Sequence, residues 1–153
     1  MESISVNYKG YIITTDKAQL QPEAIHKWLS EESYWIKGVS YETVKGTFDN
    51  SFCIGILYNE QQVGFARLVT DYYRFGYLMD VYVVKEHRGK GLGKEMMNLL
   101  LNLDWVKKLQ GILLATTNAH SLYKQFGFEA LPHPDRMMRR SDQNQRLLLG
   151  NNK

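Results

Sequence analysis

The chain has 153 residues and a formal net charge of +3 at pH 7, with 44% hydrophobic and 23% charged residues. These values are typical of one soluble globular domain and exclude a wholly disordered chain, while 3 prolines and 12 glycines exclude a collagen-like one. Nucleic-acid-binding domains usually carry a stronger or more clustered positive charge, so we expect no nucleic-acid partner.

Cys53 is the only cysteine, which excludes a disulfide within the chain and a cysteine-based zinc site. Because it lies in an apolar run, we interpret it as a small buried side chain. The 4 histidines are too far apart for a helical metal pair, so we expect no metal. No signal-peptide pattern and no run of about 18 apolar residues is present, which favours a reducing, cytoplasmic location without membrane contact.

The first part of the chain predicts one strand and two helices. Tyr11–Thr14 is a short β-branched strand candidate, and Gln21–Glu31 has apolar residues at helix spacing. Tyr34 and Trp35 then interrupt the pattern as an aromatic loop, and Tyr41–Gly46 predicts a second short helix.

The centre of the chain predicts an antiparallel meander. The strand candidates are Ser51–Tyr58, Gln62–Thr70 and Tyr77–Val84, which polar turns at 59–61 and 71–76 separate. Tyr77–Val84 is almost entirely aromatic or branched, with Asp80 in its middle.

The hydrophobic period changes after this meander. A helix is predicted over Gly91–Lys108, a strand over Ile112–Thr116 and a short helix over Ala119–Phe126. Gly127 is placed to end that helix.

The C-terminal part predicts two edge strands and a tail. The edge strands are Phe128–Leu131 and Met137–Arg140, and Ser141–Lys153 is polar apart from three leucines. We therefore expect one domain over residues 1–140 and a polar tail over 141–153.

A basic, glycine-rich loop joins the last strand of the meander to the long helix. Its sequence is Arg88-Gly89-Lys90-Gly91-Leu92-Gly93, and Lys94 follows. The first N–H groups of a helix have no partner within the helix and attract anions, and glycines allow close approach. The loop predicts a phosphate or pyrophosphate site.

Two common phosphate motifs do not fit this loop. A P-loop needs a glycine where Arg88 stands and Ser or Thr where Glu95 stands, and the dinucleotide fingerprint fails at Lys94 and at Met96. Both motifs also open parallel βαβ units, whereas this loop follows an antiparallel meander.

The pattern R-x-x-G-x-G, formed by Arg88, Gly91 and Gly93, resembles the pyrophosphate loop of the GNAT superfamily of N-acetyltransferases. A second resemblance follows downstream, where the family has N-A-x-x-L-Y-x-x-x-G-F and this chain has Asn118 through Phe128. Two spaced motifs in the family's element order support the same assignment.

The resemblance implies an α+β fold with a central, mostly antiparallel mixed sheet of six to seven strands and about four flanking helices. It also implies that the fourth and fifth strands splay apart to hold acetyl-CoA, which is a cosubstrate. Two copies of such domains often pair through their C-terminal strands, which allows a homodimer.

The residues expected to bind acetyl-CoA follow from the same resemblance. The pantetheine arm is expected to pair with the exposed edge of the fourth strand, with Asn118 beside it, and the pyrophosphate to lie on the loop. The complete set is Val81, Tyr82, Val83, Val84, Arg88, Gly89, Lys90, Gly91, Leu92, Gly93, Lys94, Asn118 and Tyr123.

The implied chemistry is direct acetyl transfer to a primary amine through a tetrahedral intermediate. Tyr123 matches the family's general acid, and backbone N–H groups near Tyr82 or Val83 are the expected oxyanion donors. Asp80 is a candidate base if Leu78, Asp80 and Tyr82 share one face, and a water chain is the alternative.

The acceptor has no signature in the sequence. Tyr34 and Trp35 lie where the family builds its acceptor wall, and core packing is an equal alternative for them. A small-molecule amine, a peptide N-terminus and a protein lysine all stay open. The competing function is a catalytically silent domain that binds or senses acetyl-CoA.

Overall fold

The computed structural model describes residues 1–140, and the predicted polar tail over 141–153 lies outside them. One sheet contains six strands in chain order: β1 (Ser5–Tyr8), β2 (Tyr11–Thr14), β3 (Phe52–Tyr58), β4 (Gln61–Thr70), β5 (Phe75–Val83) and β6 (Gly111–Leu114). Neighbours from β1 to β5 are antiparallel, and β5 and β6 are parallel. The expected mixed, mostly antiparallel sheet is confirmed, and the strand counted fourth from the sequence is β5.

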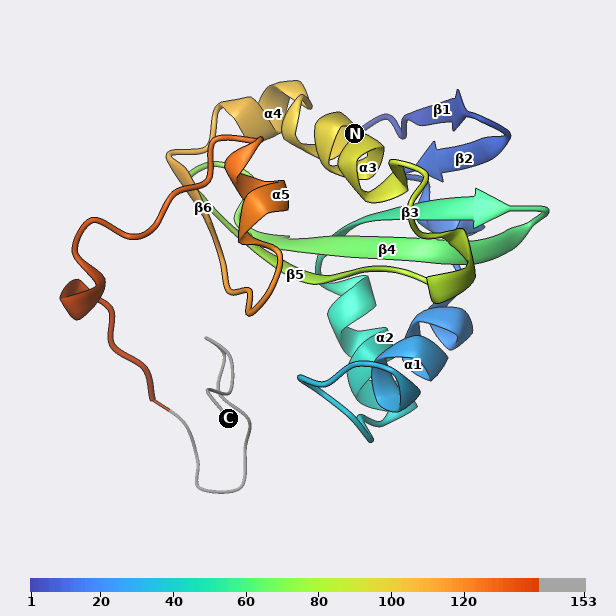
Figure 1. The fold of residues 1–153 in the computed structure, drawn as a ribbon, viewed down its shortest axis with the longest axis horizontal. Coiled ribbons are helices and arrows are strands. Elements are labelled where there is room, and N and C mark those ends of the chain that lie inside the picture. The colour runs from blue at the N-terminus through green and yellow to red at the C-terminus, as the bar shows by residue number, and fades with distance from the viewer. Residues whose placement is uncertain (141–153) are drawn as a thin grey trace.

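Helices cover both faces of this sheet (Figure 1). They are α1 (Pro22–Glu31), α2 (Tyr41–Asp49), α3 (Leu92–Leu101), α4 (Asp104–Lys107) and α5 (His120–Lys124). The pair α1 and α2 lies on one face, and α3 and α4 lie on the other. The sheet therefore separates two hydrophobic cores.

The core beneath α1 and α2 joins their apolar stripes to the sheet. Pro22 begins α1, where its missing N–H costs no hydrogen bond, and the Ser40 hydroxyl caps α2 by accepting from the Thr43 N–H at 3.2 Å. The buried members are Leu20, Ile25, Leu29, Val44, Phe48, Cys53, Phe65 and Tyr82.

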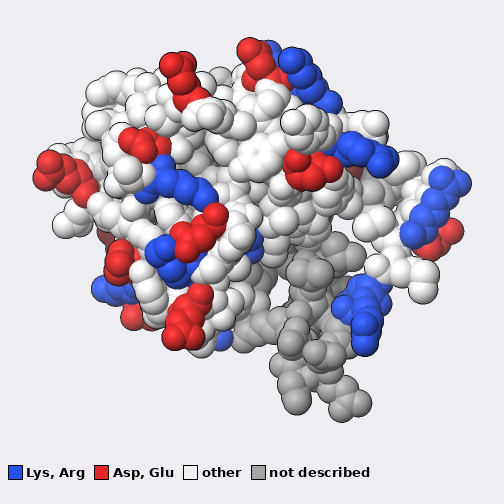
Figure 2. Space-filling model, turned by 180° about the vertical axis from the view of Figure 1, so that it is seen from behind, with Lys and Arg blue, Asp and Glu red and all other residues white. Residues whose placement is uncertain are grey.

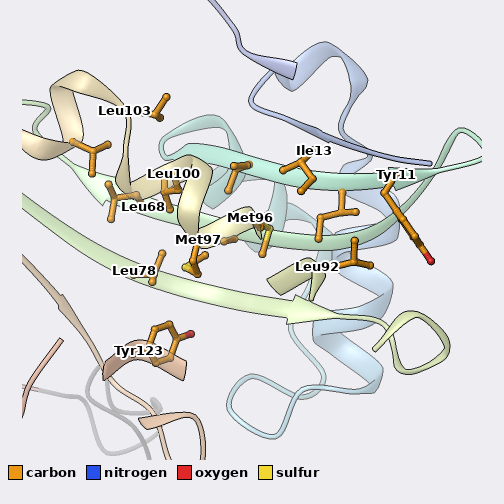
Figure 3. Packing of buried hydrophobic residues seen from close by; sticks show 14 of the residues in the cluster. Tyr11, Ile13, Leu68, Leu78, Leu92, Met96, Met97, Leu100, Leu103 and Tyr123 are labelled. Carbon is orange, nitrogen blue, oxygen red and sulfur yellow. The ribbon is translucent and has the colours of Figure 1, made fainter. Parts of the chain in front are cut away.

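The core beneath α3 is the larger one (Figure 3). Leu92, Met96, Met97 and Leu100 lie on one side of α3 and are at most 2% exposed. Full burial of each such side chain contributes roughly 1.5–3 kcal/mol, so this stripe fixes α3 on the sheet. The position of the glycine loop at the start of α3 is fixed with it.

The single helix predicted over Gly91–Lys108 is wrong, because it is broken after Leu101. Asn102 ends α3 with its side-chain amide, which donates to the Asn98 carbonyl at 2.8 Å. Leu103 is then extended, with φ −61° and ψ 135°, and α4 begins at Asp104. The extended backbone lets the Leu103 side chain enter the core, where it is 8% exposed.

The predicted edge strands Phe128–Leu131 and Met137–Arg140 are also wrong. Gly127 adopts φ +85° at the end of α5, as expected of a helix-ending glycine. The Phe128 N–H then donates to the Tyr123 carbonyl at 3.2 Å, and its ring packs edge-on against Tyr123. Phe128 is thus held by α5 instead of pairing with β6.

On the face drawn in Figure 2, Lys and Arg side chains lie among Asp and Glu side chains, so this face mixes both signs of charge. None of the helices in residues 1–140 is long and apolar enough to cross a membrane.

The burial of Cys53 gives a first testable prediction. Removal from water raises the pKa of its thiol to about 12, so at pH 8 only about one molecule in 10⁴ carries the reactive thiolate. We expect Ellman's reagent to leave the native protein unreacted over minutes at pH 8. A urea-denatured sample is the control and should release one thiol per chain, since Cys53 is the only cysteine. Rapid release from native protein would contradict the buried placement.

Candidate functional site

The glycine loop leads from β5 to α3 with two residues in the left-handed region. Gly89 has φ +77° and Gly91, the residue before α3, has φ +78°. No side chain caps this helix start, so the N–H groups of its first turn keep no partner within the helix. Together with the helix dipole and the positive charges of Lys90 and Lys94, they make this helix start attractive to an anion, and the phosphate site there stays a prediction.

The first hairpin, formed by β1 and β2, contacts this loop from the side and supports it. The Tyr11 hydroxyl hydrogen-bonds His87 Nδ1 at 2.7 Å, and the Lys90 ammonium donates to that hydroxyl at 3.2 Å. The Tyr8 hydroxyl donates to the Lys90 carbonyl at 3.4 Å. A pocket of about 340 Å³ lies between these tyrosines and Gly89. Sequence reasoning missed this brace, although Val6 and Tyr8 alternate with polar residues, because β1 has only four residues and is mostly exposed.

β5 extends beyond its pairing with β6, whereas β6 is paired over its whole length. The parallel register joins Phe75–Leu78 to Gly111–Leu114 and stops there. Within residues 1–140, β5 continues from Met79 to Val83 with β4 as its partner and no strand on its other edge. We call the space beside this unpaired part of β5, beyond the end of β6, the split.

A β-bulge in β5 lies directly beyond the last paired residue. Arg67 lies opposite Met79, but Phe65 lies opposite Tyr82, so β5 carries one extra residue here. Asp80 absorbs the irregularity with φ +54°, a conformation that Asp tolerates better than most residues. The expectation that Leu78, Asp80 and Tyr82 share one face is therefore wrong, because Leu78 packs in the α3 core and Tyr82 in the other core.

The Asp80 carboxylate is buried in an ion pair. It is 8% exposed, and its Oδ2 accepts from Arg67 Nε at 2.6 Å. Arg67 also donates to the Ser51 hydroxyl at 3.1 Å. Sequence reasoning missed Arg67, although one basic and one acidic residue in adjacent apolar strands is a signal for such a pair.

The aromatic loop after α1 lies on the same face as this ion pair. The Trp35 indole N–H donates to Asp80 Oδ1 at 2.9 Å. The Trp28 ring stacks on Tyr82 with centroids 4.0 Å apart. The Tyr34 side chain is 58% exposed, and its hydroxyl lies 2.5 Å from the Thr117 hydroxyl.

The downstream motif forms the other side of the split. Asn118 is exposed after β6, and Tyr123 on α5 is 8% exposed. Figure 3 shows the Tyr123 ring beneath Leu78 and Met97. Burial raises the pKa of the Tyr123 phenol to about 12, and nearby Tyr34 adds to the rise. The phenol is therefore protonated, and able to donate a proton, throughout the neutral pH range.

Several of the predicted site residues have partners away from the split, as Lys90 does with Tyr11 and Tyr82 with Trp28. The Val84 N–H donates to the Val63 carbonyl at 2.8 Å, so it faces β4 and not the split. The Arg88 guanidinium donates to the Val83 carbonyl at 2.8 Å. Within residues 1–140, no group of three His, Cys, Asp or Glu is arranged to hold a metal ion.

Comparisons with known proteins agree on one family. The model of the acetyltransferase (GNAT) family matches residues 22–128. A protein of Gibberella zeae that is named as an acetyltransferase, FG08082, is 30% identical over 140 residues, which cover 78% of this chain and 79% of the relative.

Solved structures give the same result. A crystal structure described as a GNAT-family acetyltransferase, xcc2953 of Xanthomonas campestris, is 34% identical with a TM-score of 0.84, covering 89% of this chain and 96% of that one. The SA2161 protein of Staphylococcus aureus is 18% identical with a TM-score of 0.68, covering 86% of this chain and 98% of that one, which shows the shared fold alone.

Proposed function

The chain belongs to the GNAT acetyltransferase family, and from this premise we propose that it transfers the acetyl group of acetyl-CoA directly to a primary amine. One observation carries the proposal. The split between β5 and β6 lies between a helix start suited to an anion and a buried tyrosine that keeps its proton.

The residues present fit the chemistry of the cosubstrate. In the proposal, the backbone N–H groups from Gly89 to Lys94 hold the pyrophosphate and the Arg88 guanidinium adds charge. Asn118 and the free edge of β5 hold the pantetheine arm. These sites would be occupied by a thioester that brings an activated acetyl group.

The edge of β5 also supports an oxyanion site. The Val84 N–H points to β4, and successive residues along a strand direct their backbone groups to opposite edges. The N–H of Val83 then faces the split, whereas that of Tyr82 faces β4. We therefore assign Val83 as the oxyanion donor and Val81 as a further pairing residue for the pantetheine arm.

The proposed chemistry needs one acid and one proton acceptor. The neutral amine attacks the thioester carbonyl, the tetrahedral intermediate forms, and the C–S bond breaks as the Tyr123 phenol protonates the departing thiolate. The amine proton leaves to water, because the Asp80 carboxylate is already bound to Arg67. In the proposal, Tyr34 and Trp35 line the acceptor side. Small-molecule, peptide and protein amines are all candidate acceptors.

The screen itself tests the proposal. Each amine is incubated with acetyl-CoA, and free CoA thiol is measured. Because Cys53 is buried, the protein adds little background to this measurement. Acetyl-CoA binding without CoA release by any amine class would favour the silent binding domain instead.

Gly91→Ala tests the loop. A side chain is strained at φ +78°, by roughly 1–2 kcal/mol, and its Cβ would lie 3.1 Å from the Tyr8 hydroxyl. The loop should shift to relieve this strain and lose the alignment of its N–H groups. We expect the dissociation constant of acetyl-CoA, measured by calorimetry, to rise at least about tenfold, or 1.4 kcal/mol.

The matched control for this change is Gly46→Ala. Gly46 lies in α2, has ordinary backbone angles and open space around it, so its acetyl-CoA affinity should equal that of wild type. Unchanged affinity in a folded Gly91→Ala protein would refute the loop assignment.

Tyr123→Phe tests the proposed acid. The change keeps the ring and removes the proton, and loss of a general acid typically lowers the rate by about 10²–10⁴-fold. We expect kcat to fall by this order with acetyl-CoA affinity nearly intact. With its pKa near 12, Tyr123 should also cause no alkaline decline in the wild-type kcat below about pH 11.

Tyr41→Phe is the matched control, since it removes an exposed phenol on α2 that bonds Glu23. If Tyr123→Phe lowers only the melting temperature and leaves kcat unchanged, Tyr123 is a core residue and not the acid.

A further inference from the structure

The buried ion pair in the sheet has no part in the chemistry proposed above. Arg67 and Asp80 are each 8% exposed, although charged side chains are seldom buried without a specific reason. Their charges cancel, and Ser51 takes one further guanidinium N–H. The pair is therefore satisfied, and its cost of desolvation is offset only while both partners stay in place.

Asp80 connects this pair to the loop that leads away from α1. One carboxylate oxygen binds Arg67 and the other accepts the indole N–H of Trp35. A hydrogen bond to a charged acceptor is about twice as strong as a neutral one. Trp35 in turn packs edge-on against Tyr34, with ring centroids 4.9 Å apart.

Tyr34 carries the connection to the other side of the split. Its hydroxyl meets that of Thr117, which directly precedes Asn118. Thr117 belongs to the segment after β6, whereas Asp80 belongs to β5. The loop after α1 is thus attached to β5 and to the segment that follows β6, and Asp80 is its buried attachment point.

We propose that Asp80 is a positioning residue for acetyl transfer: paired with Arg67, it holds the Trp35 indole and so fixes the acceptor wall formed by Tyr34 and Trp35 beside the split. This inference rests on the proposed function. Proton abstraction by Asp80 would leave the Arg67 charge buried without its counter-ion, which disfavours a role as the base.

Four variants distinguish a positioning role of Asp80 from a role as the general base. Asp80→Asn keeps an oxygen for the Trp35 N–H and tolerates the left-handed backbone, but it removes the charge. Arg67→Gln with Asp80→Asn removes both charges, so no buried ion is left unpaired. Trp35→Phe removes the indole N–H together with part of the ring. Trp105→Phe is its matched control for the lost ring area, because the buried Trp105 N–H has no hydrogen-bond partner in residues 1–140.

Kinetics are measured with the best acceptor among propylamine, phenethylamine, a peptide with a free N-terminus and a lysine-containing peptide. We expect Asp80→Asn and Trp35→Phe each to raise the KM of that amine about tenfold, the effect of one charge-assisted hydrogen bond. Combining the two should add little, because both break the same link. Trp105→Phe should match wild type, and the acidic limb of the pH–rate profile should persist in every variant.

The charge-free variant decides the matter if Asp80→Asn alone fails to fold. For a positioning residue, Arg67→Gln with Asp80→Asn should fold and keep a kcat near that of wild type, with the acceptor KM raised as in Trp35→Phe. For a base, the kcat of this variant should fall by about 10²-fold or more, because the proton acceptor is gone. Loss of the acidic limb in this variant, with a normal profile in Trp35→Phe, would overturn the proposal.

A second measurement needs no activity, so it separates this proposal from the proposed function. The indole N–H resonance of Trp35 is assigned by its loss in Trp35→Phe. In Asp80→Asn, or in the charge-free variant, it should shift and exchange faster with solvent, while that of Trp105 stays in place. An unmoved Trp35 resonance overturns the proposal even in an active enzyme. A moved resonance in a protein that acetylates none of these amines refutes the activity and keeps the structural link.

Discussion

One extra residue in β5 determines the geometry around the split. Asp80 accepts a left-handed backbone, the strand bends at that point, and its pairing with β6 ends at Leu78. The same irregularity exchanges the faces of the strand, so Leu78 packs under α3 while Tyr82 packs under α1 and α2. A regular strand would keep both residues in one core and bury Asp80 with them. The opening in the sheet and the ion pair beside it are therefore two results of a single local departure from β geometry.

The elements proposed to bind the cosubstrate and the acceptor are fixed on opposite faces of the sheet. On one side, the α3 stripe fixes the anion-binding loop through side chains such as Leu92 and Met96, which are at most 2% exposed. On the other side, the loop carrying Tyr34 and Trp35 is fixed by polar contacts to Asp80 and Thr117. Apolar packing thus positions the element proposed for the cosubstrate, which is common to the family. Directional hydrogen bonds position the element proposed for the acceptor.

Much of this arrangement could be read from the sequence, because hydrophobic period and glycine placement are local signals. Tyr11–Thr14 was predicted with the bounds it has, and the six-stranded mixed sheet and the loop before α3 follow the expected order. Three features depend on contacts between distant residues and could not be read in this way. They are the bulge at Asp80, the turn that buries Leu103, and the capture of Phe128 by α5 in place of an edge strand. The roles of the individual site residues stay predictions.

The brace between the first hairpin and the glycine loop bears on where the folding unit begins. The family model matches from residue 22, but β2 contributes Ile13, which is fully buried, and pairs with β3. Tyr11 also holds His87 and Lys90. A fragment cut at the boundary of the family match would leave an open sheet edge at β3 and a loop without its lateral support. The segment that precedes the family match is therefore part of the same folding unit as the glycine loop within it.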